Sequence, residues 1–129
     1  VTHHSQLYSR GELGFTEFRE DQEEVMIPVK QALVRRHPRT KNISLYLSAH
    51  AGMIEGLTVP ESRIFLKRLT EHATQREFTY RHKWTVNDLV IWDNQSTMHR
   101  AMGYDNKELR DMRRTTIAGV TSSLEEMPA

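Results

Sequence analysis

Apolar residues recur at helical spacing in one clear stretch of the chain, residues 58–73. The apolar stripe of this predicted helix consists of Phe65, Leu66, Leu69 and Ala73. Thr58 and Glu61 have the spacing of a capping box, and Pro60 falls in the first turn, where a missing N–H does no harm. These signals predict an amphipathic helix that begins after Thr58 and packs through one face.

Shorter stretches alternate between apolar and polar residues, which is typical of strands with one buried face. Residues 31–37 and 44–48 flank a polar connection at residues 38–42 and predict a β-hairpin, with Leu45 and Leu47 directed into the core. Further strands are predicted at residues 78–84, 88–92, 97–102 and 110–120. Val86 and Asn87 supply a tight turn between two of them.

The remaining stretches predict loops and one more helix. Residues 1–14, 50–52 and 55–56 are interpreted as loops, and residues 16–25 as a charged helix that Pro28 ends. The tail, residues 121–129, is expected to be flexible. Because strands dominate the second half, the predicted fold is mainly β with flanking helices, an antiparallel sandwich or barrel.

Composition and charge exclude several functional classes for this chain. A net charge of +1 argues against an electrostatic nucleic-acid binder, and no apolar run approaches the ~20 residues that cross a bilayer. The absence of cysteine excludes disulfides and thiol nucleophiles and is compatible with a reducing cytoplasm. The expectation is one cytoplasmic domain, with neither nucleic acid nor membrane as a partner. The sequence opens at Val1 without an initiator Met, so it is interpreted as a piece of a longer protein.

The candidate chemistry lies in the last third of the chain. His99 follows an apolar strand, and Arg110 and Arg114 come four residues apart on the next predicted strand, where they share one face. Two guanidinium groups near an imidazole suit a small dianion held beside a metal. The same pattern also fits a surface histidine and two arginines that solvate an edge strand, and spacing alone leaves both interpretations open.

A complete metal site is not present in the sequence. Non-haem Fe(II) oxygenases use two histidines and one carboxylate, leaving coordination positions for a 2-oxo acid and oxygen. None of the seven histidines has Asp or Glu two residues later, so the expected His-x-Asp or His-x-Glu partner of His99 is missing. A serine nucleophile elbow, a glycine-rich phosphate loop and a His-Glu-x-x-His motif are missing as well.

The chain resembles the taurine/2,4-dichlorophenoxyacetate dioxygenase family (TauD/TfdA), from about Tyr8 to Val120. The resemblance rests on Trp84, residues 88–94 and 98–100, on Arg110 and residues 114–116, and on runs at residues 33–37, 44–47 and 71–84. It covers the C-terminal half of the family, and residues 71–84 are most similar to the 2,4-dichlorophenoxyacetate branch. The implied fold is a partial double-stranded β-helix (jelly-roll), with residues 1–120 forming the C-terminal part of a single dioxygenase domain.

The resemblance also implies an activity and residue roles. The family uses Fe(II) and 2-oxoglutarate to hydroxylate an aryloxyalkanoate such as 2,4-dichlorophenoxyacetate, releasing a phenol, succinate and CO2. By this resemblance His99 is the metal ligand, Arg110 binds 2-oxoglutarate and Arg114 binds the anionic substrate. Asp93 and its neighbours shape the turn that presents His99. The expected partners are the small anionic substrate, O2, the N-terminal half of the same protein and a further copy of the chain in a homo-oligomer.

Two other functions stay open. A taurine or alkylsulfonate dioxygenase of the same family would share all these residues, because most of the discriminating pocket lies outside this stretch. A truncated, non-catalytic jelly-roll would account for the absent His-x-Asp motif.

Overall fold

The computed structural model describes residues 1–14, 17–19, 21–22, 26–105, 107, 109–119, 122–125 and 127–128. Its elements are β1 (Thr2–His4), α1 (Gln6–Gly11), β2 (Val29–Gln31), β3 (Val34–Arg36), β4 (Ile43–Leu45), β5 (Ala51–Ile54), α3 (Val59–Ala73) and the 3-10 turn η1 (Arg76–Phe78). Within these residues, no helix is long and apolar enough to cross a membrane.

A small antiparallel sheet forms around the first strand. β1 lies between β2 and β5, and Thr2 is paired with Gln31 on one side and Ile54 on the other. A register shift between His3 and His4 interrupts the pairing with β5. The prediction of loops at residues 1–14 and 50–52 is therefore wrong in part, because β1, α1 and β5 lie there. These three-to-four-residue strands are set by partners distant in the sequence, and local periodicity cannot reveal such pairings.

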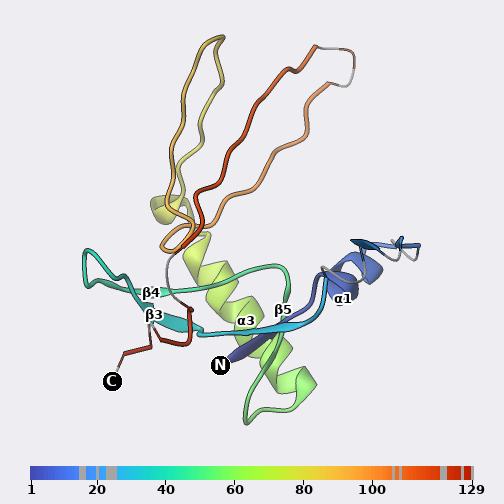
Figure 1. Cartoon of the computed structure of the whole chain (residues 1–129), viewed down its shortest axis with the longest axis vertical. Helices are drawn as coiled ribbons and strands as arrows, with labels where there is room; N and C mark the ends of the chain where they lie inside the picture. The colour runs from blue at the N-terminus through green and yellow to red at the C-terminus, as the bar shows by residue number, and fades with distance from the viewer. Residues whose placement is uncertain are drawn as a thin grey trace.

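Helix α3 forms as its capping signals predict, but its predicted apolar stripe is buried only in part, because Leu66 is 7% exposed and Phe65 is 47% exposed. Thr58 has extended backbone angles, its hydroxyl accepts from the Glu61 N–H at 3.5 Å, and the Glu61 carboxylate accepts from the Thr58 N–H at 2.9 Å. Leu66 is buried, and Ser62 accepts a hydrogen bond from the Ile54 N–H at 2.9 Å. The helix is therefore attached to β5 (Figure 1).

The predicted hairpin is also confirmed, although it is shorter than expected. β3 and β4 pair antiparallel, with Val34 opposite Leu45. Leu47 is buried at 6% exposure, whereas Leu45 is 39% exposed, so the expectation that both face the core is correct only for Leu47. The described buried apolar residues are Met26, Ala32, Leu47 and Leu66.

Beyond η1 the chain makes two long excursions away from the end of α3 (Figure 1). The first spans residues 79–92 and turns at Val86 and Asn87, as predicted, with Asn87 at a φ of 71°. The second rises through residues 97–105 and returns through residues 109–119. Within the described residues these excursions contain no paired strand, which corrects the strands predicted at residues 78–84, 88–92, 97–102 and 110–120, of which Val120 lies outside the described residues.

The physical reason is visible in the exposure of their side chains. Val86 is 91% exposed and Ile117 is 93% exposed, so the apolar positions of these excursions meet no neighbouring sheet in this chain. A strand needs a second strand to satisfy its backbone N–H and C=O groups. The alternating pattern marks a face fit for burial, and the described chain provides no partner for that face.

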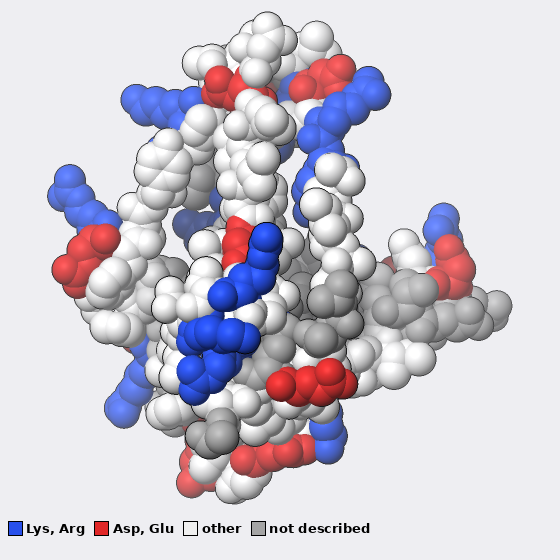
Figure 2. Space-filling view, turned by 60° about the vertical axis from the view of Figure 1, so that its left-hand side comes forward, with Lys and Arg blue, Asp and Glu red and all other residues white. Residues whose placement is uncertain are grey.

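Two predictions concern segments that are described in part. Of the predicted helix at residues 16–25, residues 16, 20 and 23–25 lie outside the described residues. The prediction is wrong at residues 17–19, which are not helical, whereas Asp21 and Gln22 are helical. In the predicted tail, Ser123 is buried and its hydroxyl accepts from the Ala32 N–H at 3.3 Å. On the face drawn in Figure 2, Lys and Arg side chains lie among Asp and Glu side chains.

Candidate functional site

The three predicted site residues all lie on the second excursion. His99 is on its rising limb, residues 97–105, and Arg110 and Arg114 are on its returning limb, residues 109–119 (Figure 1). All three are exposed. The His99 ring lies 4.9 Å from the Trp92 ring at an interplanar angle of 50°. The structure thus places these residues on one segment, without a direct bond among them in the part that it describes.

The two arginines have no carboxylate partner among the described residues. The Arg110 guanidinium lies 4.7 Å from the centre of the Tyr104 ring, and its Nε–H donates to the Met112 sulfur at 2.9 Å. Arg113, which lies between them in the sequence, forms an ion pair with Asp111, with Nε 3.7 Å from Asp111 Oδ1. In the described residues no carboxylate occupies the Nη donors of Arg110 or the guanidinium of Arg114, and a carboxylate is the group that a guanidinium fork fits best.

The turn before His99 is held by its first residue. One Asp93 carboxylate oxygen accepts from the Gln95 N–H at 2.9 Å and the other from the Ser96 hydroxyl at 2.8 Å. The Asp93 carbonyl accepts from both the N–H and the hydroxyl of Thr97, at 3.0 and 2.6 Å. The Gln95 N–H, followed by Ser96 and His37, lowers the pKa of Asp93 below its usual value. Residues 93–97 thus form a closed turn that ends two positions before His99.

The β3–β4 hairpin fixes this turn from outside. His37 Nε2 lies 3.1 Å from Asp93 Oδ2, and the Ser44 hydroxyl donates to the Gln95 carbonyl at 3.2 Å. Gly119 also lies near this turn, since a Cβ there would be 3.8 Å from the Gln95 side-chain nitrogen Nε2. Sequence reasoning found the Asp93 turn but missed His37, because no local pattern links residues that far apart in the chain.

A metal site is not complete in the described part of the chain. No group of three or more His, Asp or Glu side chains there is placed to hold a metal ion. His99 offers one exposed imidazole and therefore fits one ligand position of a site that needs three protein ligands. The described residues therefore do not by themselves fit a whole iron centre.

The other histidines have structural partners. His82 Nε2 lies 2.9 Å from Asp88 Oδ2, at the base of the turn formed by Val86 and Asn87. The Thr85 hydroxyl and N–H donate to the same carboxylate and, ahead of His82, lower the pKa of Asp88. The ring of His72 meets the Phe78 ring edge-on at 5.3 Å.

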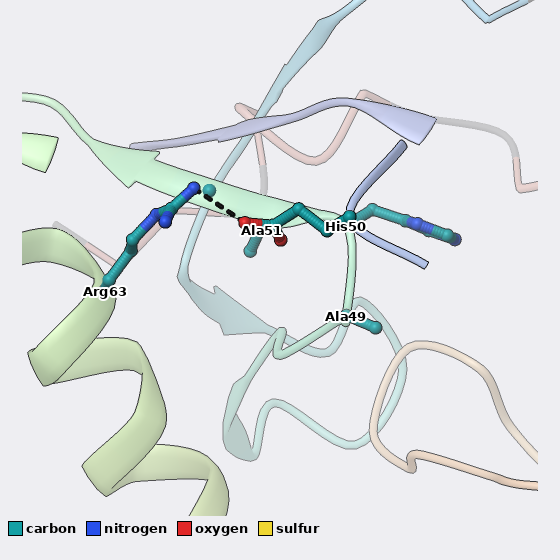
Figure 3. Close-up of a pocket in the computed structure, with 6 residues that line it drawn as sticks. Ala49, His50, Ala51 and Arg63 are labelled. Carbon is teal, nitrogen blue, oxygen red and sulfur yellow. Dashed lines mark hydrogen bonds and ion pairs between the residues drawn. The ribbon is translucent and has the colours of Figure 1, made fainter. Parts of the chain in front are cut away.

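A cavity of about 160 Å³ lies near the N-terminal sheet, apart from this site, and its lining includes Glu12, His50 and Arg63. Arg63 Nη2 is 2.9 Å from the Glu12 carboxylate, and His50 points away from Arg63 (Figure 3). His50 Nδ1 is instead 2.7 Å from the Ser9 hydroxyl. The charges of this cavity are therefore already paired.

Comparison with known proteins gives the family. Residues 1–116 match the family described as "Taurine catabolism dioxygenase TauD, TfdA family". The chain belongs to the TauD/TfdA family.

Similar relatives within the TauD/TfdA family carry related names. The chain is 49% identical over 113 residues to an alpha-ketoglutarate-dependent 2,4-dichlorophenoxyacetate dioxygenase of Cupriavidus pinatubonensis, covering 88% of this chain and 39% of the relative. It is 34% identical over 122 residues to an (S)-phenoxypropionate/alpha-ketoglutarate-dioxygenase of Delftia acidovorans, covering 90% and 41% respectively. This TauD/TfdA chain thus spans about two fifths of the length of these relatives.

A solved relative confirms the predicted fold class. The crystal structure of AAD-2 in complex with Mn(II) and N-oxalylglycine superposes with a TM-score of 0.86 at 53% identity, covering 95% of this chain and 48% of that one. The chain is therefore part of the jelly-roll fold of TauD-like dioxygenases. The separated limbs of the two excursions belong to this partial fold.

Proposed function

We propose that the chain is the C-terminal part of an Fe(II)- and 2-oxoglutarate-dependent dioxygenase that hydroxylates an aryloxyalkanoate such as 2,4-dichlorophenoxyacetate. The products are a phenol, succinate and CO2. The observation that carries the proposal is the 49% identity over 113 residues to a relative named for that substrate. The solved relative with Mn(II) and N-oxalylglycine, an analogue of 2-oxoglutarate, supports the cofactor assignment.

Three residues of this chain have roles in the proposal. His99 contributes one imidazole ligand to the iron, and Arg110 binds the distal carboxylate of 2-oxoglutarate. Arg114 pairs with the carboxylate of the substrate. Iron, when bound, supplies the activation of O2. The exposed guanidinium groups of Arg110 and Arg114, which have no carboxylate partner in the described chain, support these anion-binding roles.

The remaining ligands belong to the rest of the complete protein. The chain corresponds to 39% of the length of its 2,4-dichlorophenoxyacetate-named relative, so there is room for a His-x-Asp or His-x-Glu segment outside it. Activity is accordingly a property of the complete polypeptide, and experiments on the reaction need that polypeptide.

The test measures phenol and succinate release by the complete protein from 2,4-dichlorophenoxyacetate, with Fe(II) and 2-oxoglutarate. His99→Ala should abolish Fe(II)-dependent turnover. Arg110→Gln should raise the KM for 2-oxoglutarate about 10- to 100-fold, and Arg114→Gln should do the same for the aryloxyalkanoate, because a hydrogen bond to a charged group is worth about 1.5–3 kcal/mol.

Arg113→Gln is the matched control for both arginine variants. It removes the same charge from the same limb, but Arg113 lies next to Asp111 and on the opposite face of the alternating pattern. Both KM values should stay within about twofold of the unsubstituted protein, since an exposed ion pair contributes little. If Arg113→Gln shifts the KM values as much as the other two variants, the arginines act through general charge and the assigned roles are wrong.

A second candidate function is favoured by one observation. The described residues contain no group of three or more His, Asp or Glu side chains that could hold a metal. A non-catalytic jelly-roll remnant is consistent with this observation. The turnover assay distinguishes the dioxygenase from the non-catalytic remnant. Turnover of any aryloxyalkanoate by the complete protein rejects the non-catalytic remnant. Turnover of taurine or another alkylsulfonate in place of aryloxyalkanoates would keep the family chemistry and reject the proposed substrate class.

A further inference from the structure

The contact between His37 and Asp93 joins two parts of the chain that are far apart in sequence. His37 lies directly after β3, at the start of the hairpin turn, and Asp93 begins the turn that leads to His99. The His37 side chain is only 13% exposed, and its Nε2 is 3.1 Å from Asp93 Oδ2. The Asp93 side chain is 45% exposed, so this link between the hairpin and the candidate site is shielded on the His37 side only.

The hydrogen bonds of His37 define its protonation form. Nδ1 accepts from the backbone N–H of Arg39 at 3.2 Å and from that of Thr40 at 3.0 Å. A backbone N–H can only donate, so Nδ1 carries no proton. The single ring proton then lies on Nε2, where it is donated to the Asp93 carboxylate. The geometry thus selects the neutral Nε2–H tautomer and makes the imidazole a rigid bridge between two turns.

Asp93 passes this constraint on to the approach of His99. Its carboxylate also accepts from the Gln95 N–H and the Ser96 hydroxyl, and its carbonyl accepts from Thr97. Every residue from 95 to 97 is therefore bonded back to Asp93 before the chain reaches His99. The preceding Trp92 donates its indole N–H to Asn94 at 2.7 Å and lies with its ring 4.9 Å from the His99 ring.

We propose that His37 and Asp93 form a positioning pair that fixes the turn before His99 and so orients the His99 imidazole toward the metal. Neither residue is a metal ligand in this proposal, which rests on the proposed role of His99 as one. The pair acts by limiting the orientations of His99, and a ligand that is already oriented loses less freedom when the metal binds.

The test compares two isosteric variants in the complete protein. His37→Asn keeps an acceptor near the Nδ1 position for the Arg39 and Thr40 N–H groups and loses the donor to Asp93. His37→Gln keeps a donor near the Nε2 position and loses the acceptor. Because the proposal assigns the function to the Asp93 bond, His37→Asn should weaken Mn(II) binding about tenfold or more, and His37→Gln by less than about threefold, when Mn(II) alone is titrated.

His82→Asn provides the matched control. It breaks a different His–Asp pair, His82 with Asp88, on the first excursion, at a turn that does not lead to His99. It should leave the Mn(II) affinity within about twofold of the unsubstituted protein. Equal losses in His37→Asn and His82→Asn, or no loss in His37→Asn, would overturn the proposal, and so would the absence of any Mn(II) binding by the unsubstituted protein.

A measurement without substitution covers the case in which a variant does not fold. In the ¹⁵N-histidine spectrum of the unsubstituted protein at neutral pH, His37 should show an unprotonated Nδ1 and a protonated Nε2. A protonated Nδ1 would contradict the bridge. The same experiments distinguish the positioning pair from the proposed function. If the complete protein turns over an aryloxyalkanoate and His37→Asn leaves the Mn(II) affinity unchanged, only the positioning pair is rejected. Mn(II) affinity that falls in His37→Asn, without aryloxyalkanoate turnover, rejects the substrate alone.

Discussion

His4 makes the stability of the N-terminal sheet depend on pH. It lies at the end of β1, is 7% exposed, and has Nε2 2.8 Å from the Thr2 hydroxyl. Its ring stacks on Tyr46 at a centroid distance of 5.6 Å. Burial, followed by the positive charges of His50 and His3, lowers the pKa of His4 from 6.5 to about 4.

The direction of the effect follows from the two pKa values. The unfolded chain takes up a proton on this imidazole below pH 6.5, whereas the folded protein does so only near pH 4. Stability from His4 is therefore complete above pH 6.5 and is lost as the pH falls from there toward 4. One pKa unit corresponds to about 1.4 kcal/mol, so the full loss has an upper limit of about 3 kcal/mol, of which about 2 kcal/mol is reached near pH 5.

The assay is urea unfolding of the chain at a series of pH values from about 4 to 8, read by circular dichroism. The quantity compared is the difference in unfolding free energy between the unsubstituted chain and His4→Gln, because Asp and Glu side chains also titrate at the acid end. His4→Gln should remove most of the pH dependence between 6.5 and 4. Leu47→Val is the matched control: it lowers stability by about 1 kcal/mol through a lost methylene and should keep the pH dependence.

Two results would refute this reasoning. One is a pH dependence in His4→Gln as steep as in the unsubstituted chain, which would assign the effect to another group. The other is a direct NMR titration of the His4 ring with a midpoint near 6.5, the ordinary value. In that case the ring is hydrated in solution and its burial in β1 is not maintained.

Two further predictions concern the helix and the metal. Thr58→Ala should lower the free energy of unfolding by about 1 kcal/mol, because it removes the capping acceptor of α3. Thr58→Ser retains the hydroxyl and should keep most of that stability. Equal losses for the two variants in urea unfolding would contradict the capping role. The 129-residue chain by itself should bind Fe(II) only weakly in an anaerobic titration, because His99 supplies one ligand, and tight stoichiometric binding would show that further ligands lie within the chain.

The parts of the fold that could be predicted from the sequence are those fixed by neighbours along the chain. Helix α3 is predicted by Thr58, Pro60 and Glu61, which all lie within one turn of its start. The β3–β4 hairpin has strands close in sequence, and the turn at Asn87 needs one residue with a positive φ. In each case the stabilising contact joins residues a few positions apart, so the sequence pattern contains both partners.

The parts that were missed depend on distant partners. β1 and β5 are strands because Thr2 meets both Gln31 and Ile54, and neither pairing has a local signature. The strands predicted in the two excursions are not formed, because they too lack a partner that the local sequence can supply. Their alternating pattern is present, but the strands that would accept their backbone groups are not among the described residues.

The candidate site shows the same division. Spacing selected His99, Arg110 and Arg114, but spacing alone left the surface interpretation open, and their roles came from the resemblance to a family. The Asp93 turn is local, and its structural role was expected from the resemblance. Its partner His37 was not, because a single histidine after a strand has no pattern that points to a turn in the second half of the chain.

The residues that stabilise this chain and the residues of its candidate site are almost entirely separate. The buried contacts lie in the β2–β1–β5 sheet, α3 and the segments around Ala32 and Leu47, whereas His99, Arg110 and Arg114 are exposed on the second excursion. Substitutions at these three positions should therefore change ligand binding while costing little stability, as is usual for exposed positions. Within the described residues, bonds from His37 to Asp93 and from Ser44 to Gln95 join the hairpin to the turn before His99. Through these bonds the order of the small hairpin determines how well the chain can hold His99 in place.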